Sequence, residues 1–138
     1  DHRALHSFPT RRSSDLRIEQ SDATVWISAL DNRSIRGSRR LLVTHLTDLQ
    51  NTGIRYAEPE RRTLLDWGRL PHLVRAGKAQ VTVRSELARS LRVWALAPNG
   101  RRLAEVPART EGNAITFTAD VAADPATGAR MLYELAVP

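Results

Sequence analysis

The sequence predicts an all-β fold over residues 17–138. Short runs of β-favouring apolar residues recur along this region, and clusters of Gly, Asn, Asp and Pro separate them. No stretch has the apolar period of a helix longer than about two turns, so a parallel sheet with helical crossovers cannot be built from it. About seven short strands with this spacing are typical of an antiparallel Ig-like β-sandwich.

The first half of this region contains two clear strands and one irregular segment. We expect strands over residues 24–30, where alternate residues share one face, and over residues 40–47. Glu58-Pro59-Glu60 could open a short helix, because proline suits the first helical turn, and Gly68 would limit it to about two turns. A hairpin is expected from residues 72–75 and 79–84, around Ala76-Gly77-Lys78.

The second half gives the strongest local signal. Two apolar runs over residues 91–106 flank Pro98-Asn99-Gly100, and Asn-Gly favours the positive φ angles of a tight hairpin turn. Ile115 and Phe117 then alternate with threonines in a strand over residues 114–119. A last strand is expected over residues 130–136.

The N-terminus is different in kind. Residues 6–16 read HSFPTRRSSDL, which matches the translation of a common sequencing-library adapter. The match implies a foreign segment joined to a gene fragment from environmental DNA. We therefore expect residues 1–16 to be a foreign or disordered tail, and the natural sequence upstream of Arg17 to be missing.

The composition excludes several functions. The chain has 138 residues and no cysteine, so disulfides, zinc–thiolate sites and thiol catalysis are excluded. Its net charge of +6 suggests nucleic-acid binding, but the arginines are spread along the chain among acidic residues instead of clustering on one element. We expect no nucleic-acid partner. No segment approaches the ~20 apolar residues of a membrane span, and no membrane partner is expected.

No residues stand out as a catalytic or metal site. His45 shares a strand face with Leu41 and Val43, which indicates a hydrogen-bonded, partly buried histidine, and His72 has no second ligand at a zinc-motif spacing. We therefore expect no metal, no cofactor and no catalytic residue. Carboxylate pairs could cleave a glycosidic bond, but the available carboxylates lie among arginines or at turns. They are expected to be solvated charges with surface partners: Asp48, Glu58, Glu60, Asp66, Glu105 and Glu134.

Aromatic residues are the candidate carbohydrate-binding groups. Tryptophan rings stack on sugars, but they also fill sandwich cores. Trp67, Trp26 and Tyr56 are the candidates, and for Trp67 packing is the favoured interpretation. Trp94 lies inside a strand, on the face opposite Val93.

Several segments, in order, resemble the C-terminal β-sandwich domain of large bacterial glycoside hydrolases. The matching segments are Ser38 to Thr44, Asn51-Thr52-Gly53, Asp66-Trp67-Gly68 with Pro71 and Leu73-Val74, Val93 to Leu96, Gly100-Arg101-Arg102, Val106-Pro107 and Met131 to Glu134. The chain departs from the family pattern at His45 to Asp48, where small apolar residues are expected.

The resemblance implies a non-catalytic accessory domain whose partner is an upstream catalytic barrel. The domain would brace this barrel or line part of its substrate cleft. It also implies a secreted or periplasmic bacterial protein. No catalytic residues are carried over, because the family's catalytic carboxylates belong to the barrel. Two alternatives stay open: an autonomous carbohydrate-binding module that binds polysaccharide, and a structural Ig-like adhesive domain.

Overall fold

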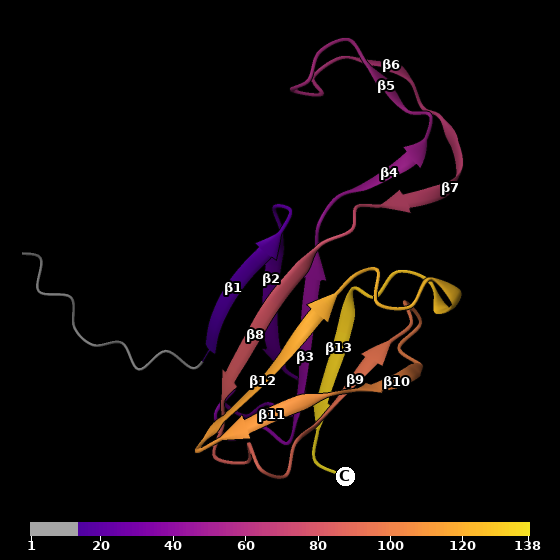
Figure 1. Cartoon of the computed structure of the whole chain (residues 1–138). Coiled ribbons are helices and arrows are strands. Elements are labelled where there is room, and N and C mark those ends of the chain that lie inside the picture. The colour runs from indigo at the N-terminus through magenta and orange to yellow at the C-terminus, as the bar shows by residue number, and fades with distance from the viewer. Residues whose placement is uncertain (1–13) are drawn as a thin grey trace, which may run out of the picture.

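The computed structural model describes residues 14–138, which form two antiparallel sheets stacked as a sandwich, with a projecting arm (Figure 1). The all-β fold class is confirmed. The four-stranded sheet has the order β1 (Ser14–Gln20), β8 (Lys78–Arg84), β12 (Ala114–Asp120) and β11 (Ala108–Glu111). The five-stranded sheet has the order β10 (Arg102–Val106), β9 (Arg92–Leu96), β13 (Leu132–Ala136), β3 (Arg40–Leu46) and β2 (Thr24–Ala29). These nine strands exceed the seven predicted.

Alternate side chains of both sheets fill the space between them. The predicted alternation of β12 is confirmed, because Ile115 and Phe117 are buried. Phe117 meets Tyr133 of the opposite sheet with ring centroids 5.4 Å apart. Such aromatic pairs add about 0.5–1.5 kcal/mol to the stability beyond the free energy gained from the apolar area that they bury. The buried cluster also takes members from β3, β8, β9 and β13: Leu41, Val43, Val81, Val83, Val93, Ala95 and Leu135.

The hairpin predicted over residues 91–106 is confirmed as β9 and β10. Ala97 donates its N–H to the carbonyl of Arg101 at 2.8 Å, and Gly100 donates its N–H to the carbonyl of Ala97 at 2.9 Å. Gly100 has φ +85°, the conformation for which Asn-Gly was expected. The Trp94 side chain lies on the face of β9 opposite that of Val93, as predicted, since Val93 is buried in the core and Trp94 is only partly buried.

Two expected local elements are wrong. No helix forms at Glu58; its carbonyl accepts the Arg61 N–H at 3.1 Å in a turn between β5 (Arg55–Tyr56) and β6 (Leu64–Asp66). The hairpin of residues 72–75 with 79–84 does not form either. β7 (Arg69–Val74) pairs with β4 (Leu49–Thr52), while β8 pairs with β1 and β12. Local sequence identified these strands, but long-range pairing chose their partners.

β1 begins earlier than the expected domain boundary. Ser14 and Leu16 pair with Val83 and Val81 of β8, so three residues assigned to the tail belong to a strand. The expected disorder of residues 1–13 lies outside the described residues. One 3₁₀ turn, η1 (Pro125–Thr127), precedes β13. Within residues 14–138, no helix is long and apolar enough to cross a membrane.

Candidate functional site: an exposed arm

The most distinctive feature of the molecule is an arm of residues 47–75 that leaves the sandwich between β3 and β8. Its strands form two antiparallel ribbons, β4 with β7 and β5 with β6, which project beyond the two sheets (Figure 1). The base is closed where the Thr47 hydroxyl donates to the carbonyl of Arg75 at 2.6 Å and Arg75 donates its N–H to the carbonyl of Asp48 at 2.9 Å. The arm therefore starts and ends at one point of the sandwich.

An ion-pair cluster around Asp48 ties the turn between β5 and β6 back to this base. Arg61, in that turn, donates to both Asp48 oxygens at 3.0 and 2.7 Å, while Arg75 and Gln50 donate at 3.3 and 2.9 Å. The hydrogen bonds from Arg61 are the main cause that lowers the pKa of Asp48 to about 2. The carboxylate thus stays charged above that pH, and the arm is held in a folded-back shape.

The junction of the two ribbons depends on close backbone approach at Gly68. The Asn51 amide donates to the carbonyl of Trp67 at 2.9 Å, and Gly68 donates its N–H to the Asp66 carboxylate at 2.9 Å. Gly68 has φ +70°, and a Cβ there would lie 2.4 Å from the carbonyl oxygen of Thr52. Only glycine fits this crossing without a backbone shift.

We predict that Gly68→Ala loosens the arm and leaves the sandwich intact. Hydrogen exchange should show faster exchange in residues 47–75, with protection unchanged in β12 and β13. Gly53→Ala is the matched control, because Gly53 has a similar φ of +75° but no atom within 4 Å of the added Cβ. Equal effects of the two variants would contradict a steric requirement at Gly68.

The arm exposes a concentration of large apolar side chains. Within its 29 residues, five such side chains are between 53% and 73% exposed: Leu49, Leu65, Trp67, Leu70 and Leu73. Single exposed apolar residues are ordinary on a protein surface, but a dense group on a projecting element is typical of an interaction site. We call these five residues the arm apolar set.

The structure separates the three aromatic residues predicted to bind carbohydrate. Trp67 follows β6 in the arm and is 73% exposed, so the favoured interpretation that it packs is wrong. Tyr56 lies half-buried on β5 of the same ribbon. Trp26 is 68% exposed but lies on β2, an edge strand of the five-stranded sheet. The arm leucines and the Asp48–Arg61 pair were not anticipated, because alternation alone does not distinguish an exposed ribbon from a core strand.

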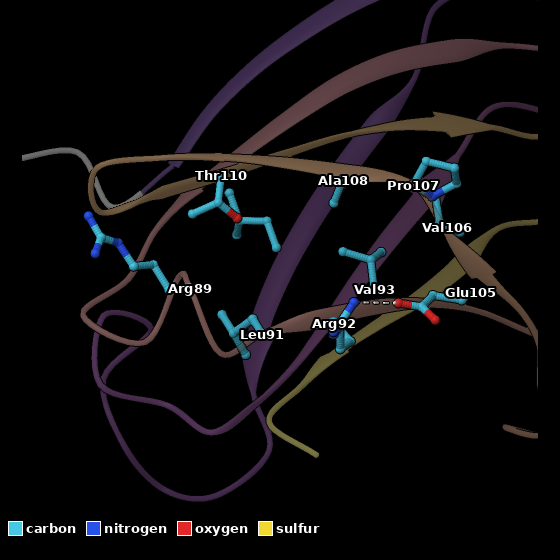
Figure 2. Close-up of a pocket in the computed structure, with 10 residues that line it drawn as sticks. Arg89, Leu91, Arg92, Val93, Glu105, Val106, Pro107, Ala108 and Thr110 are labelled. Atoms are coloured by element: carbon cyan, nitrogen blue, oxygen red, sulfur yellow. Dashed lines mark hydrogen bonds and ion pairs between the residues drawn. The ribbon is translucent and has the colours of Figure 1, made fainter.

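A cleft of about 530 Å³ opens where the edges of the two sheets diverge (Figure 2). Leu91, Val93 and Ile115 line it from the core, and Arg92 pairs with Glu105 at 3.4 Å beside it. Glu105 is the one carboxylate among the described residues that line this cleft. The cleft does not bring together the two carboxyl groups that most glycosidic cleavage requires.

Two polar residues differ from what the sequence suggested. His45 lies on the core face as predicted, but it is fully buried and neither ring nitrogen has a hydrogen-bond partner among residues 14–138. Glu134 is buried, not solvated, and binds two arginines. His72 bonds to Asn51 through Nδ1 at 2.7 Å. The described chain contains no group of three or more His, Asp or Glu residues arranged to hold a metal ion.

Comparisons with protein-family models, with curated proteins and with solved structures found no match for this chain. The two-sheet sandwich and its arm define the class of protein by fold alone: an all-β domain with a projecting arm.

Proposed function

We propose that the chain is a non-catalytic β-sandwich domain of a carbohydrate-processing enzyme, and that its arm docks on the catalytic domain. The single observation that carries the docking proposal is the arm apolar set. Its five large side chains project into solvent on an element fixed by ion pairs and backbone hydrogen bonds. A rigid apolar projection gains free energy by entering a complementary surface, and little ordering entropy is lost when it does so.

The assignment to a carbohydrate-processing enzyme is supported by the ordered resemblance to the C-terminal domains of bacterial glycoside hydrolases. Several of its segments fall in the arm, among them Asn51-Thr52-Gly53 and Asp66-Trp67-Gly68. The arm conformation uses these same residues, since Asn51 and Gly68 fix the crossing of the two ribbons. In such a protein, the arm would brace the catalytic barrel or line part of its substrate cleft.

The second candidate function is an autonomous carbohydrate-binding module. The high exposure of Trp67 and Trp26 favours it, because sugar rings stack on open indole faces. The two rings lie on separate elements, the arm and the edge strand β2, and not on one ribbon. Retention on insoluble polysaccharide that is lost in Trp67→Ala would favour this function over docking.

We predict that the isolated chain self-associates through the arm. In the absence of a partner, the arm apolar set should bind the same surface of a second copy of the chain. Sedimentation velocity should then show species larger than the monomer that increase with concentration. The double variant Trp67→Ser with Leu70→Ser should sediment as a monomer with an unchanged circular dichroism spectrum. Trp26→Ser is the matched control, since it removes a similarly exposed tryptophan outside the arm and should leave association unchanged.

Two outcomes would overturn the proposed function. A wild-type chain that stays monomeric at high concentration would show that the arm apolar set is not an adhesive surface. Turnover of an aryl glycoside by this chain, abolished by substituting one of its carboxylates, would show that the domain is itself catalytic.

A further inference from the structure

The outer face of the five-stranded sheet, away from the arm, contains a buried carboxylate between two exposed arginines. Glu134 is 4% exposed at the centre of β13. Arg40 of β3 donates through Nε to one of its oxygens at 2.6 Å, and Arg102 of β10 donates through Nε to the other at 2.7 Å. Burial alone would raise the pKa of Glu134, but the hydrogen bonds from Arg102 and Arg40 outweigh it and lower the pKa. Each oxygen of the carboxylate therefore has one arginine donor, and the group is ionised.

The arginines keep binding capacity that Glu134 does not use. Both bind it through Nε, and their terminal nitrogens make no hydrogen bond to residues 14–138. The Arg40 and Arg102 side chains remain 62% and 47% exposed. Two guanidinium charges against one carboxylate leave a net charge of +1. Guanidinium forks bind carboxylates through paired N–H donors, so the cluster is suited to a carboxylate ligand.

Tryptophans on the same face restrict how the ligand lies. The Arg102 guanidinium lies 4.8 Å from the ring centroid of Trp94, which holds it against the sheet. Trp26 of β2 donates its indole N–H to the Ser28 hydroxyl at 2.7 Å, which holds the indole beside β2 while the side chain stays 68% exposed. β3 lies between β2 and β13, so the axes of these two strands are roughly 10 Å apart. A chain of sugars can reach both the arginines and Trp26, whereas a single sugar cannot.

We propose that this face binds a uronic-acid oligosaccharide, with a carboxylate between Arg40 and Arg102 and a sugar ring stacked on Trp26. The inference rests on the proposed carbohydrate-related function and specifies its ligand class as acidic. Charge complementarity selects the ligand, because a neutral glycan would leave the terminal donors of both arginines without ionic partners.

The test is a titration of the ¹⁵N-labelled chain with trigalacturonate and with its fully methyl-esterified counterpart. We expect the indole N–H signals of Trp94 and Trp26 to shift with the acid and not with the ester. Arg102→Gln should weaken binding about tenfold or more, as the loss of a charge-assisted hydrogen bond predicts. Arg101→Gln is the matched control, since this neighbouring arginine makes no ion pair with the described residues. It should change affinity less than twofold.

Glu134→Gln separates binding from a purely structural role, and it covers the case in which Arg102→Gln does not fold. It removes the neutralising charge while keeping the side-chain shape, so acid binding should tighten by about three- to tenfold. An unchanged or lower affinity in a folded Glu134→Gln chain would overturn the proposal. Equal binding of the ester, equal loss in Arg101→Gln, or equally tight binding of inorganic phosphate or a single-stranded oligonucleotide would do the same. Failure here with intact arm-dependent association would leave the proposed docking function standing.

Discussion

Replacing Tyr133 with alanine is expected to lower the free energy of unfolding by about 3–5 kcal/mol. Tyr133 is 1% exposed on β13, and its ring is the partner of Phe117 across the two sheets. Its single O–H donor is shared between the backbone carbonyls of Asp120 and Arg130, which lie 3.3 and 3.4 Å from the hydroxyl oxygen. The substitution removes the ring that joins the sheets and leaves a cavity between them. Small domains have a total stability of about 5–15 kcal/mol, so much of it should be lost.

Tyr133→Phe separates packing from hydrogen bonding. It keeps the ring and removes only the hydroxyl, so the expected loss is about 1 kcal/mol. Urea unfolding followed by tryptophan fluorescence measures both variants. If Tyr133→Ala cost no more than Tyr133→Phe, the ring would not be part of a shared core, and the stacking of the two sheets would be contradicted.

The sequence predicts the sandwich better than the arm for a physical reason. In β12, alternation marks Ile115 and Phe117 because one face of the strand enters the core. The turn at Asn99-Gly100 requires a positive φ, which few residues adopt, and local sequence therefore identifies the hairpin. Both signals arise from constraints that act within a few residues of the chain.

The arm lacks such constraints. Its ribbons are held by pairs such as Asp48 with Arg61, and its leucines are exposed, so apolar spacing says nothing about which face is buried. Gly68 suggested only the end of a helix, whereas its true role is the close approach to Thr52. No local pattern marks Trp67 as exposed, which is why packing was the wrong expectation for that side chain.

Glu134 illustrates a second limit of sequence-based prediction. Its neighbours in the sequence are apolar, and its two arginine partners come from β3 and β10, which are 94 and 32 residues away. Sequence alone suggested a solvated charge. The sheet order places β13 at the centre of the five-stranded sheet, where a solvent-facing carboxylate is covered by long side chains from both directions.

The second expected result with a large effect is a loss of stability in mild acid, caused by protonation of the buried His45. Its imidazole is fully buried beside the base of the arm, and neither nitrogen has a hydrogen-bond partner among the described residues. Burial lowers its pKa below the usual 6.5, and the opposing attraction of Asp120 is the smaller influence. The carboxylate of Asp120 is itself paired with Lys78 at 3.4 Å.

The direction of the effect follows from proton linkage. The unfolded chain takes up the proton near pH 6.5, while the folded chain resists protonation until a lower pH. The free energy of unfolding is therefore unaffected by His45 protonation above about pH 6.5, and it decreases as the pH falls from there through the folded-state pKa. One proton gives a slope of at most about 1.4 kcal/mol per pH unit.

His45→Leu should abolish this slope and raise stability at neutral pH by up to about 1–3 kcal/mol, since an apolar side chain leaves no buried polar atom unpaired. Urea unfolding between about pH 7.5 and 5 measures the slope for each variant.

His72→Gln is the control, because His72 is exposed on β7 and bonds to Asn51, and its replacement should leave the slope unchanged. A His45→Leu chain that lost stability in acid as steeply as the wild type would mean that the buried imidazole is not the group being protonated. Asp48 could not supply the same slope, because in the unfolded chain it takes up its proton near the ordinary carboxyl pKa of 3.8, below the range measured, and in the folded chain its pKa is lower still, about 2.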